Sequence, residues 1–260
     1  MTEELVKALD GNTFVVSDAR GDIEASPTDP TGLFSYDTRF LSRWVLTVDD
    51  HRLTELSTDD LNYFETKYFL VPGTGTVYVD AKMSVIRQRA VVDGFREQVT
   101  ILNHDAIPVR LTLRIDVAAD FADLFEVKDA LVKKGRYYLR PGSGVLVIGY
   151  ERDTYRRETE IHAADATDIA EDAITFDVTI DGHSQWTTEL RVVPRLLRAD
   201  GRPLVTSRRN GHGQQDLLDR LQRWIGGAPR LVSDWEPLGT TYRRSLVDLA
   251  ALRFSPTIAG

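Results

Sequence analysis

The chain has 260 residues, of which 42% are hydrophobic, so it can bury one large core or two small ones. Its net charge of −8 argues against binding to nucleic acid, and no apolar run approaches the ~20 residues of a membrane helix. The sequence contains no cysteine, which excludes disulfides and suits a reducing cytoplasm, and its acidic N-terminus does not resemble a signal peptide.

Alternating apolar and polar residues predict β-strands along residues 13–193. Turn signals separate these segments, among them Arg20-Gly21-Asp22, Asp49-Asp50-His51 and Asp93-Gly94. The predicted strands are residues 13–17, 44–48, 53–56, 63–71, 76–80, 83–92, 95–103, 109–117, 137–139, 145–150, 154–162, 174–180 and 186–193. So many short strands without intervening helices favour antiparallel pairing, and a sheet of this size usually splits into two layers. We therefore expect a large antiparallel β-sandwich, similar to a supersandwich.

The stretch from residue 32 to residue 44 follows a loop rich in Pro, Ser and Thr and leads into a strand. Tyr36, Asp37 and Arg39 lie together here. They could hold a polar ligand, because Asp and Arg make directional hydrogen bonds and an aromatic face stacks on sugar rings. The alternative is a buried Asp–Arg contact that fixes a long loop.

Residues 118–126 interrupt the strand pattern with Asp120, Asp123 and Glu126, which stand three residues apart. On a helical turn these carboxylates would share a face, where they could perform acid/base chemistry or bind a cation. The alternative is a connection in which the acids cap turns while Phe121, Leu124 and Phe125 pack.

The pattern changes near Pro194. Residues 198–213 are polar and read as a linker. Two helices are then predicted from apolar spacing, the first ending at Gly226-Gly227 and the second preceded by Ser233-x-x-Glu236, which has the form of a capping box. The apolar positions that define them are Leu217, Leu218, Leu221, Trp224 and Ile225, followed by Tyr242, Leu246, Leu249 and Leu252. We divide the chain into a β domain, residues 1–197, and a helical tail, residues 198–260.

Charge is also uneven along the chain. From Arg191 onward there are 12 Arg and no Lys against 6 acidic residues, so this part carries +6 and residues 1–190 carry −14. The basic tail is either a solvated surface or a segment that docks on an acidic one. The five histidines show no metal-ligand spacing, and no nucleophile or phosphate-loop motif is present. We expect neither a metal nor another cofactor.

Three stretches together resemble the N-terminal domain of bacterial glycogen debranching (amylo-α-1,6-glucosidase) proteins. They are residues 9–14 with Ser17-Asp18-x-x-Gly21-Asp22, then Gly32-Leu33-Phe34-x-x-Asp37-Thr38-Arg39-Phe40-Leu41, and then residues 120–127. The Ser245-Leu-x-Asp248-Leu pattern near the end also fits. The resemblance implies a β-sandwich joined by linker helices to a catalytic (α/α)6 barrel. It also implies that the family's catalytic acids lie beyond Gly260, so none is carried over.

Three functions remain open at this point. The first is a non-catalytic domain that supports the barrel and shapes an α-glucan cleft, with Tyr36, Asp37, Arg39, Asp120 and Asp123 as glucan or domain-interface contacts. The second is a free-standing α-glucan-binding module. The third is a sandwich-fold aldose mutarotase, which would need a His and a carboxylate in one pocket, with His104 and His162 available. The apolar helical tail would dock on the barrel, fold back, remain mobile or form a homodimer.

Overall fold

The computed structural model describes residues 5–26, 30–73, 82–92, 94–129, 131, 133–204 and 213–253, with the side chains of residues 60 and 61 left out. The first strands are β1 (Val6–Asp10), β2 (Thr13–Ser17), β3 (Ile23–Glu24), β4 (Gly32–Ser35), β5 (Thr38–Leu41), β6 (Arg43–Val48), β7 (His51–Asn62), β8 (Glu65–Pro72) and β9 (Met83–Val91). The others are β10 (Phe95–Asn103), β11 (Val109–Ala118), β12 (Arg136–Gly142), β13 (Val145–Arg152), β14 (Tyr155–His162), β15 (Asp168–Ile169), β16 (Ala173–Ile180) and β17 (Gln185–Leu197). The helices are α1 (Leu124–Lys128), α2 (Gln214–Gly226) and α3 (Glu236–Ala251).

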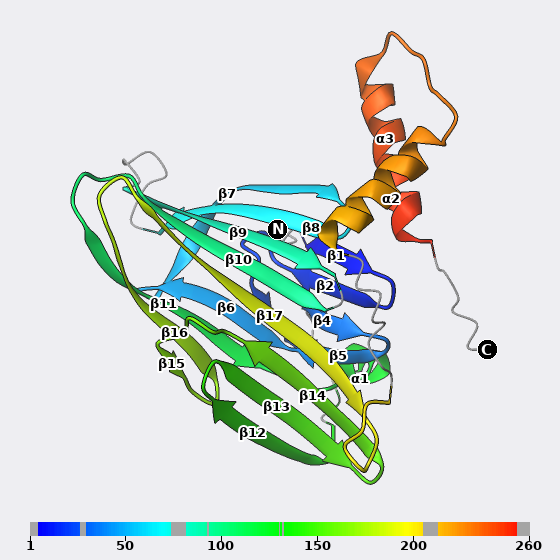
Figure 1. The fold of residues 1–260 in the computed structure, drawn as a ribbon. Helices are drawn as coiled ribbons and strands as arrows, with labels where there is room; N and C mark the ends of the chain where they lie inside the picture. Colours follow the sequence, from blue (N-terminus) through cyan, green and yellow to red (C-terminus); the bar gives the residue numbers. More distant parts are fainter. Residues whose placement is uncertain are drawn as a thin grey trace.

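Antiparallel pairing joins most strands into one large sheet that folds over into two layers (Figure 1). Its order is β12-β13-β14-β17-β10-β9-β8-β7-β6-β11-β16-β15, and β3 pairs with β6. Aromatic rings meet between the layers. The ring centroids of Trp44 on β6 and Phe95 on β10 are 5.4 Å apart, and those of Phe176 on β16 and Trp186 on β17 are 5.6 Å apart. The predicted antiparallel β-sandwich is therefore confirmed.

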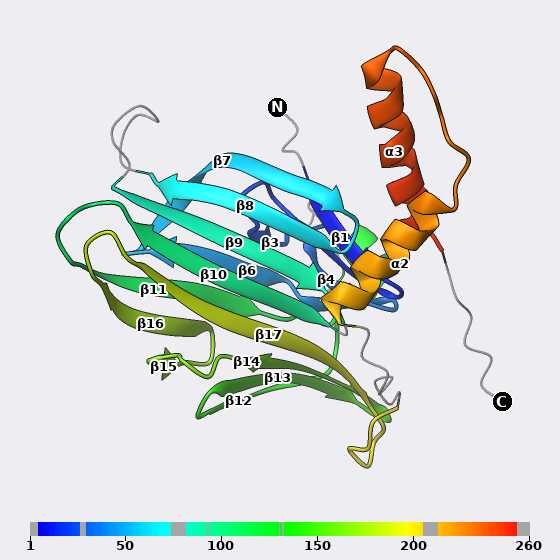
Figure 2. The same cartoon turned by 45° about the horizontal axis from the view of Figure 1, so that its top comes forward.

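A smaller sheet, in the order β1-β2-β4-β5, covers one end of the sandwich, and Figure 2 shows it beside α2. Side-chain hydrogen bonds attach it to the large sheet. The Thr159 hydroxyl on β14 donates to the carbonyl of Phe40, at 2.7 Å, and the hydroxyls of Ser17 and Tyr68 are 2.9 Å apart. This arrangement brings β5, and with it Arg39, against the connection that follows β11.

Turn chemistry accounts for several connections. Asp49 and Asp50 both have positive φ, 48° and 62°, as a two-residue hairpin turn requires, and Asp is among the residues that accept this geometry. Gly21 also has positive φ, +82°, in the predicted turn before β3. No strand was predicted between residues 32 and 43, where β4 and β5 form a hairpin. The predicted strand at residues 76–80 lies outside the described residues, as does Asp93.

A network of buried charges connects the layers near Trp44. Glu97 on β10 is fully buried, and one of its carboxylate oxygens accepts hydrogen bonds from Trp44 Nε1, at 3.0 Å, and from Arg87 Nε, also at 3.0 Å. Its other oxygen accepts from Arg89 Nε at 2.8 Å. Arg87 also donates to the carboxylate of Asp22 at 2.6 Å, so the loop before β3 is held to β9. Burial alone would raise the pKa of Glu97, but the two guanidinium groups hold it below its usual value.

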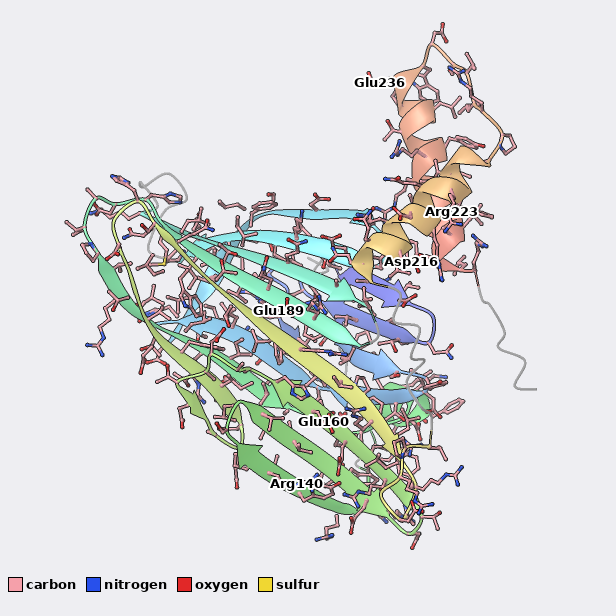
Figure 3. The ribbon with its side chains drawn as sticks, in the orientation of Figure 1. Arg140, Glu160, Glu189, Asp216, Arg223 and Glu236 are labelled. Atoms are coloured by element: carbon pink, nitrogen blue, oxygen red, sulfur yellow. The ribbon has the colours of Figure 1, made fainter. Side chains whose placement is uncertain are left out.

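The two C-terminal helices form where apolar spacing predicts them. Leu217 and Leu221 of α2 are buried against Phe64, which lies between β7 and β8, and Trp224 Nε1 donates to the carbonyl of Leu246 on α3 at 3.0 Å. Figure 3 shows Asp216 and Arg223 near opposite ends of α2, which suits the helix dipole. The helices therefore fold back partly onto the sandwich and partly onto each other.

The capping box predicted from Ser233 and Glu236 is wrong. The residue that precedes α3 is Trp235, whose side chain makes no capping hydrogen bond, and Ser233 Oγ instead accepts from the Trp235 amide at 3.0 Å. Part of the apolar stripe of α3 is uncovered, since Leu249 and Leu252 are both exposed. Among the described residues, no helix is long and apolar enough to cross a membrane.

Candidate functional site

The candidate residues begin in the tight turn between β4 and β5. Ser35 pairs with Thr38, which leaves Tyr36 and Asp37 as the turn residues, and Tyr36 has a positive φ of 56°. The Tyr36 amide donates to the carbonyl of Asn12 at 2.8 Å, which fixes the turn to the β1–β2 connection. Tyr36 and Asp37 are both exposed, so their side chains are available to a ligand or to another domain.

Arg39, two residues farther along β5, is paired with the second motif rather than with Asp37. Its Nε lies 3.1 Å from both carboxylate oxygens of Asp120, and its side chain is 8% exposed against 37% for that of Asp120. A Cβ at Gly32 would lie 2.6 Å from Cδ of Arg39, so a glycine is needed beside this side chain. In place of the expected contact between Asp37 and Arg39 within one loop, Arg39 therefore pairs with Asp120 and joins the two motifs.

Asp123 is the N-cap of α1 and forms a complete capping box with Glu126. Its carboxylate accepts from the amides of Phe125 and Glu126, both at 2.9 Å, and Glu126 accepts from the Asp123 amide at 2.8 Å. Lys133 Nζ is 2.7 Å from the Glu126 carboxylate. Burial alone would lower the pKa of Lys133, but this hydrogen bond and the nearby acidic groups raise it. Asp120 precedes the helix, so the prediction that Asp120, Asp123 and Glu126 share a helical face is wrong.

Backbone hydrogen bonds join the two motifs directly. The amide of Arg39 donates to the carbonyl of Ala122 at 2.8 Å, and the amide of Leu124 donates to the carbonyl of Asp37 at 3.0 Å. Thus the structure brings together all five candidate residues, Tyr36, Asp37, Arg39, Asp120 and Asp123. The expected packing of residues 121–125 holds only for Phe121, which is fully buried, whereas Leu124 and Phe125 are exposed. Phe125 is 77% exposed.

A cluster of aromatic rings beneath these motifs was not predicted. Phe121 packs against Phe40 and Tyr150, and the hydroxyl of Tyr155 lies 3.0 Å from Thr38 Oγ1. Tyr137 donates to the carbonyl of Asp120 at 2.9 Å, while burial, and then the nearby carboxylate, raise its pKa to about 12. The tyrosines belong to β12, β13 and β14, far from either motif in sequence. Strand alternation could indicate their faces, but only the sheet order shows that they meet.

The arrangement offers recognition more readily than acid/base chemistry. Asp120 is bound by Arg39, Asp123 caps a helix and Glu126 is paired with Lys133, so each of these carboxylates already has a structural partner. Within the described ranges, no group of three or more His, Asp or Glu side chains could hold a metal ion. The exposed groups of the site are Tyr36, Asp37, Leu124 and Phe125, a mixed polar and apolar surface of the kind found at protein interfaces.

The two histidines considered for a mutarotase lie in different places. His104 follows β10 and its Nε2 is 2.8 Å from Ser84 Oγ, in a hollow whose lining contains no Asp or Glu. His162 lies on β14, with its Nε2 3.6 Å from the carboxylate of Glu160, and half of its side chain is exposed. Neither lies in the pocket with a facing carboxylate that a mutarotase requires.

Comparison with known proteins identifies a family. Residues 9–191 match the model of the N-terminal domain of some glycogen debranching enzymes, a range that includes all three motifs. No curated protein matches the sequence.

Among solved structures, a human-microbiome protein assigned as a kojibiose phosphorylase is similar in fold. It has a TM-score of 0.56 and 10% identity, over 95% of this chain and 35% of that one. A polysaccharide lyase matches at a TM-score of 0.33, with 11% identity over 76% of this chain and 34% of that one. A galactose mutarotase-like protein from Clostridium acetobutylicum matches at a TM-score of 0.25, with 8% identity over 60% of this chain and 67% of that one. The chain spans about a third of the length of the first two proteins.

Proposed function

Because this chain belongs to the family of N-terminal domains of glycogen debranching enzymes, we propose that it is a non-catalytic β-sandwich domain supporting an (α/α)6 catalytic barrel that acts on α-glucans. The family match carries this proposal. The chain matches about a third of the kojibiose phosphorylase-like protein, so the remaining two thirds of that protein are long enough to include a separate catalytic domain. The parent enzyme would be an amylo-α-1,6-glucosidase-like glycoside hydrolase of the cytoplasm.

Exposed apolar side chains support a docking surface at the end of the sandwich that carries the three helices. On α1 these are Leu124 and Phe125, and on and before α3 they include Trp235, Leu249 and Leu252. Figure 1 shows α1, α2 and α3 at the same end, beside the small sheet, and Figure 2 shows the same for α2 and α3. Large apolar groups concentrated in this way are typical of an interface with another domain.

At the same end, the five candidate residues take different roles in the proposal. Tyr36 and Asp37 are exposed and would contact the barrel or line the edge of its glucan cleft. Arg39, Asp120 and Asp123 would act by holding the β4–β5 turn against α1. The proposal therefore gives Tyr36 and Asp37 a direct contact, and gives the other three residues the role of positioning them.

The test uses this chain and the catalytic domain, produced separately. By itself the chain should hydrolyse neither maltoheptaose nor an α-1,6-branched dextrin, and sedimentation should show a complex when the two domains are mixed. Phe125→Asp and Leu252→Asp should weaken the complex at least tenfold, because each places a charge in a buried apolar contact. Ile107→Asp is the matched control, since Ile107 is also exposed but follows β10 at the opposite end.

Other outcomes separate the alternatives. Hydrolysis by the chain alone would contradict a non-catalytic role. No association in the mixture, together with dimers of the chain that Leu252→Asp dissociates, would indicate that the helices pair with a second copy instead. Association that Phe125→Asp and Ile107→Asp weaken equally would refute the proposed surface.

A further inference from the structure

The outer face of the large sheet carries a groove that shares no residue with the surface proposed for the catalytic domain. It is a hollow of about 320 Å³ across β8, β9, β10 and the start of β17. The side chains that line it are Lys67, Phe69, Ile86, Gln88, Gln98, Thr100, Leu102 and Gln185. A second hollow, of about 580 Å³, adjoins it because both include Leu102 and Gln185. We call the two together the outer groove.

Strand register arranges these side chains in rows across the sheet. Lys67 pairs with Gln88, and Gln88 pairs with Gln98, which makes a polar row. Two residues along the strands, Phe69 pairs with Ile86 to make an apolar row. Side chains on one face recur every second residue, so the rows lie side by side on the outside of the sheet.

The outer groove has unused hydrogen-bonding groups. The side-chain amides of Gln98 and Gln185 make no hydrogen bond to the described residues, and each amide supplies both donors and an acceptor. Gln88 lies on β9, between β8 and β10. Its side-chain amide donates a hydrogen bond to the carboxylate of Glu65, which fixes its orientation. The partly buried faces of Phe69 and Ile86 provide apolar surface beside these amides.

The outer groove also contains little charge. Charged residues make up 28% of the chain, yet the lining of the first hollow includes only Lys67, and the second hollow includes no Asp, Glu, Lys or Arg. Glu189, which Figure 3 labels, pairs with Gln98 across β10 and β17 and so borders the groove without being part of its lining. A neutral ligand with many hydroxyls fits this lining, because amides can bind the hydroxyls while its C–H faces lie on the apolar row.

We propose that the outer groove binds a neutral oligosaccharide, and specifically a stretch of α-glucan. The choice of α-glucan rests on the substrate class of the proposed function. The inference that the groove binds a neutral oligosaccharide rests only on the side chains that line it. A peptide added as a strand is disfavoured, because β8, β9, β10 and β17 already have strand neighbours on both sides. A nucleic acid is disfavoured by the lack of positive charge.

The position of the outer groove gives the binding a distinct consequence. The connections from β10 to β11 and from β16 to β17, which carry His104 and His183, lie at the end of the sandwich away from α2 and α3 (Figure 1). A glucan chain held here is anchored at a distance from the catalytic domain of the proposed function. Such anchoring raises the local concentration of glucan ends at the enzyme without contributing to the reaction.

The test is a titration of maltoheptaose, up to millimolar concentration, into the full chain, followed by calorimetry and by NMR of the side-chain amides. We expect binding with shifts at Gln98 and Gln185. Gln98→Ala should weaken binding at least tenfold, and so should Phe69→Leu, which removes the aromatic face but keeps an apolar residue. Glu171→Gln, which changes an exposed residue outside the groove, should bind as the parent does.

Each result bears on the proposal. No binding, or binding abolished by Asp37→Ala and unchanged in Gln98→Ala, would overturn it. A loss of binding in Gln98→Ala counts only if the thermal midpoint of unfolding is unchanged, which is expected for an exposed side chain. Association with the catalytic domain is measured separately and without glucan. A chain that binds no glucan in the groove could therefore still associate with the catalytic domain, and a chain that does not associate could still bind glucan.

Discussion

Replacing Glu97 with glutamine should destabilise the domain by about 3 kcal/mol, near the low end of what breaking a buried ion pair costs. The carboxylate is fully buried and holds two guanidinium groups, while glutamine keeps its size and an acceptor for Trp44 Nε1. Arg87 would retain Asp22 as a partner. Arg89 would be left buried without a carboxylate, and its Nη1 already lacks a hydrogen bond.

Urea unfolding followed by Trp fluorescence would measure the loss, and Glu189→Gln is the matched control. Glu189 lies on neighbouring β17, where its half-exposed carboxylate is 3.5 Å from Arg96, so its replacement should cost less than about 1 kcal/mol. Adding Arg89→Met to Glu97→Gln should recover part of the loss, since it removes the unpaired charge. Equal losses for Glu97→Gln and Glu189→Gln would refute this account, as would a double variant less stable than Glu97→Gln.

Three further predictions concern the pH dependence of Glu97, two glycines and the cap of α1. The two guanidinium groups hold the pKa of Glu97 low in the folded state. The parent should therefore be more stable than Glu97→Gln by the full amount well above pH 4.3, about the usual pKa of Glu, and should lose this advantage as the pH falls through the lower folded-state pKa. A difference in stability that is independent of pH would contradict this. Gly182→Ala should lower the thermal midpoint, since a Cβ would lie 2.0 Å from the Ala106 carbonyl, whereas Gly239→Ala in exposed α3 should slow amide exchange there by favouring the helix. Asp123→Ala should cost about 0.5–2 kcal/mol, with faster exchange of the α1 amides as the sign that the cap is lost.

Sequence reasoning identified the fold because its signals are local. The 109–117 alternation became β11 within one residue, and the 95–103 segment became β10 as predicted. Similarly, apolar spacing identified α2 correctly, because a helix that packs on a flat surface needs one apolar face. The capping box before α3 failed, since a four-residue pattern does not determine where the first helical turn begins.

The candidate site was only partly predictable, because its contacts are non-local. The sequence marked Arg39 and Asp120 as members of separate breaks in the strand pattern, but their pairing across 81 positions depends on how the small sheet meets β11. The outer groove was missed altogether. Glutamines such as Gln98 are ordinary on a wet strand face, and only the register of β8, β9 and β10 shows that polar and apolar rows adjoin.

The long path of the large sheet through the described residues ends at just two strands, β12 and β15. An uncovered strand edge is a template for pairing with another molecule, and each end limits that risk differently. β15 is only two residues long, and β12 carries Arg136, Arg140 and Pro141, which oppose further pairing through charge and through a missing amide. Sheet extension from one molecule to the next is thereby discouraged. The two ends of this sheet therefore disfavour aggregation through strand pairing.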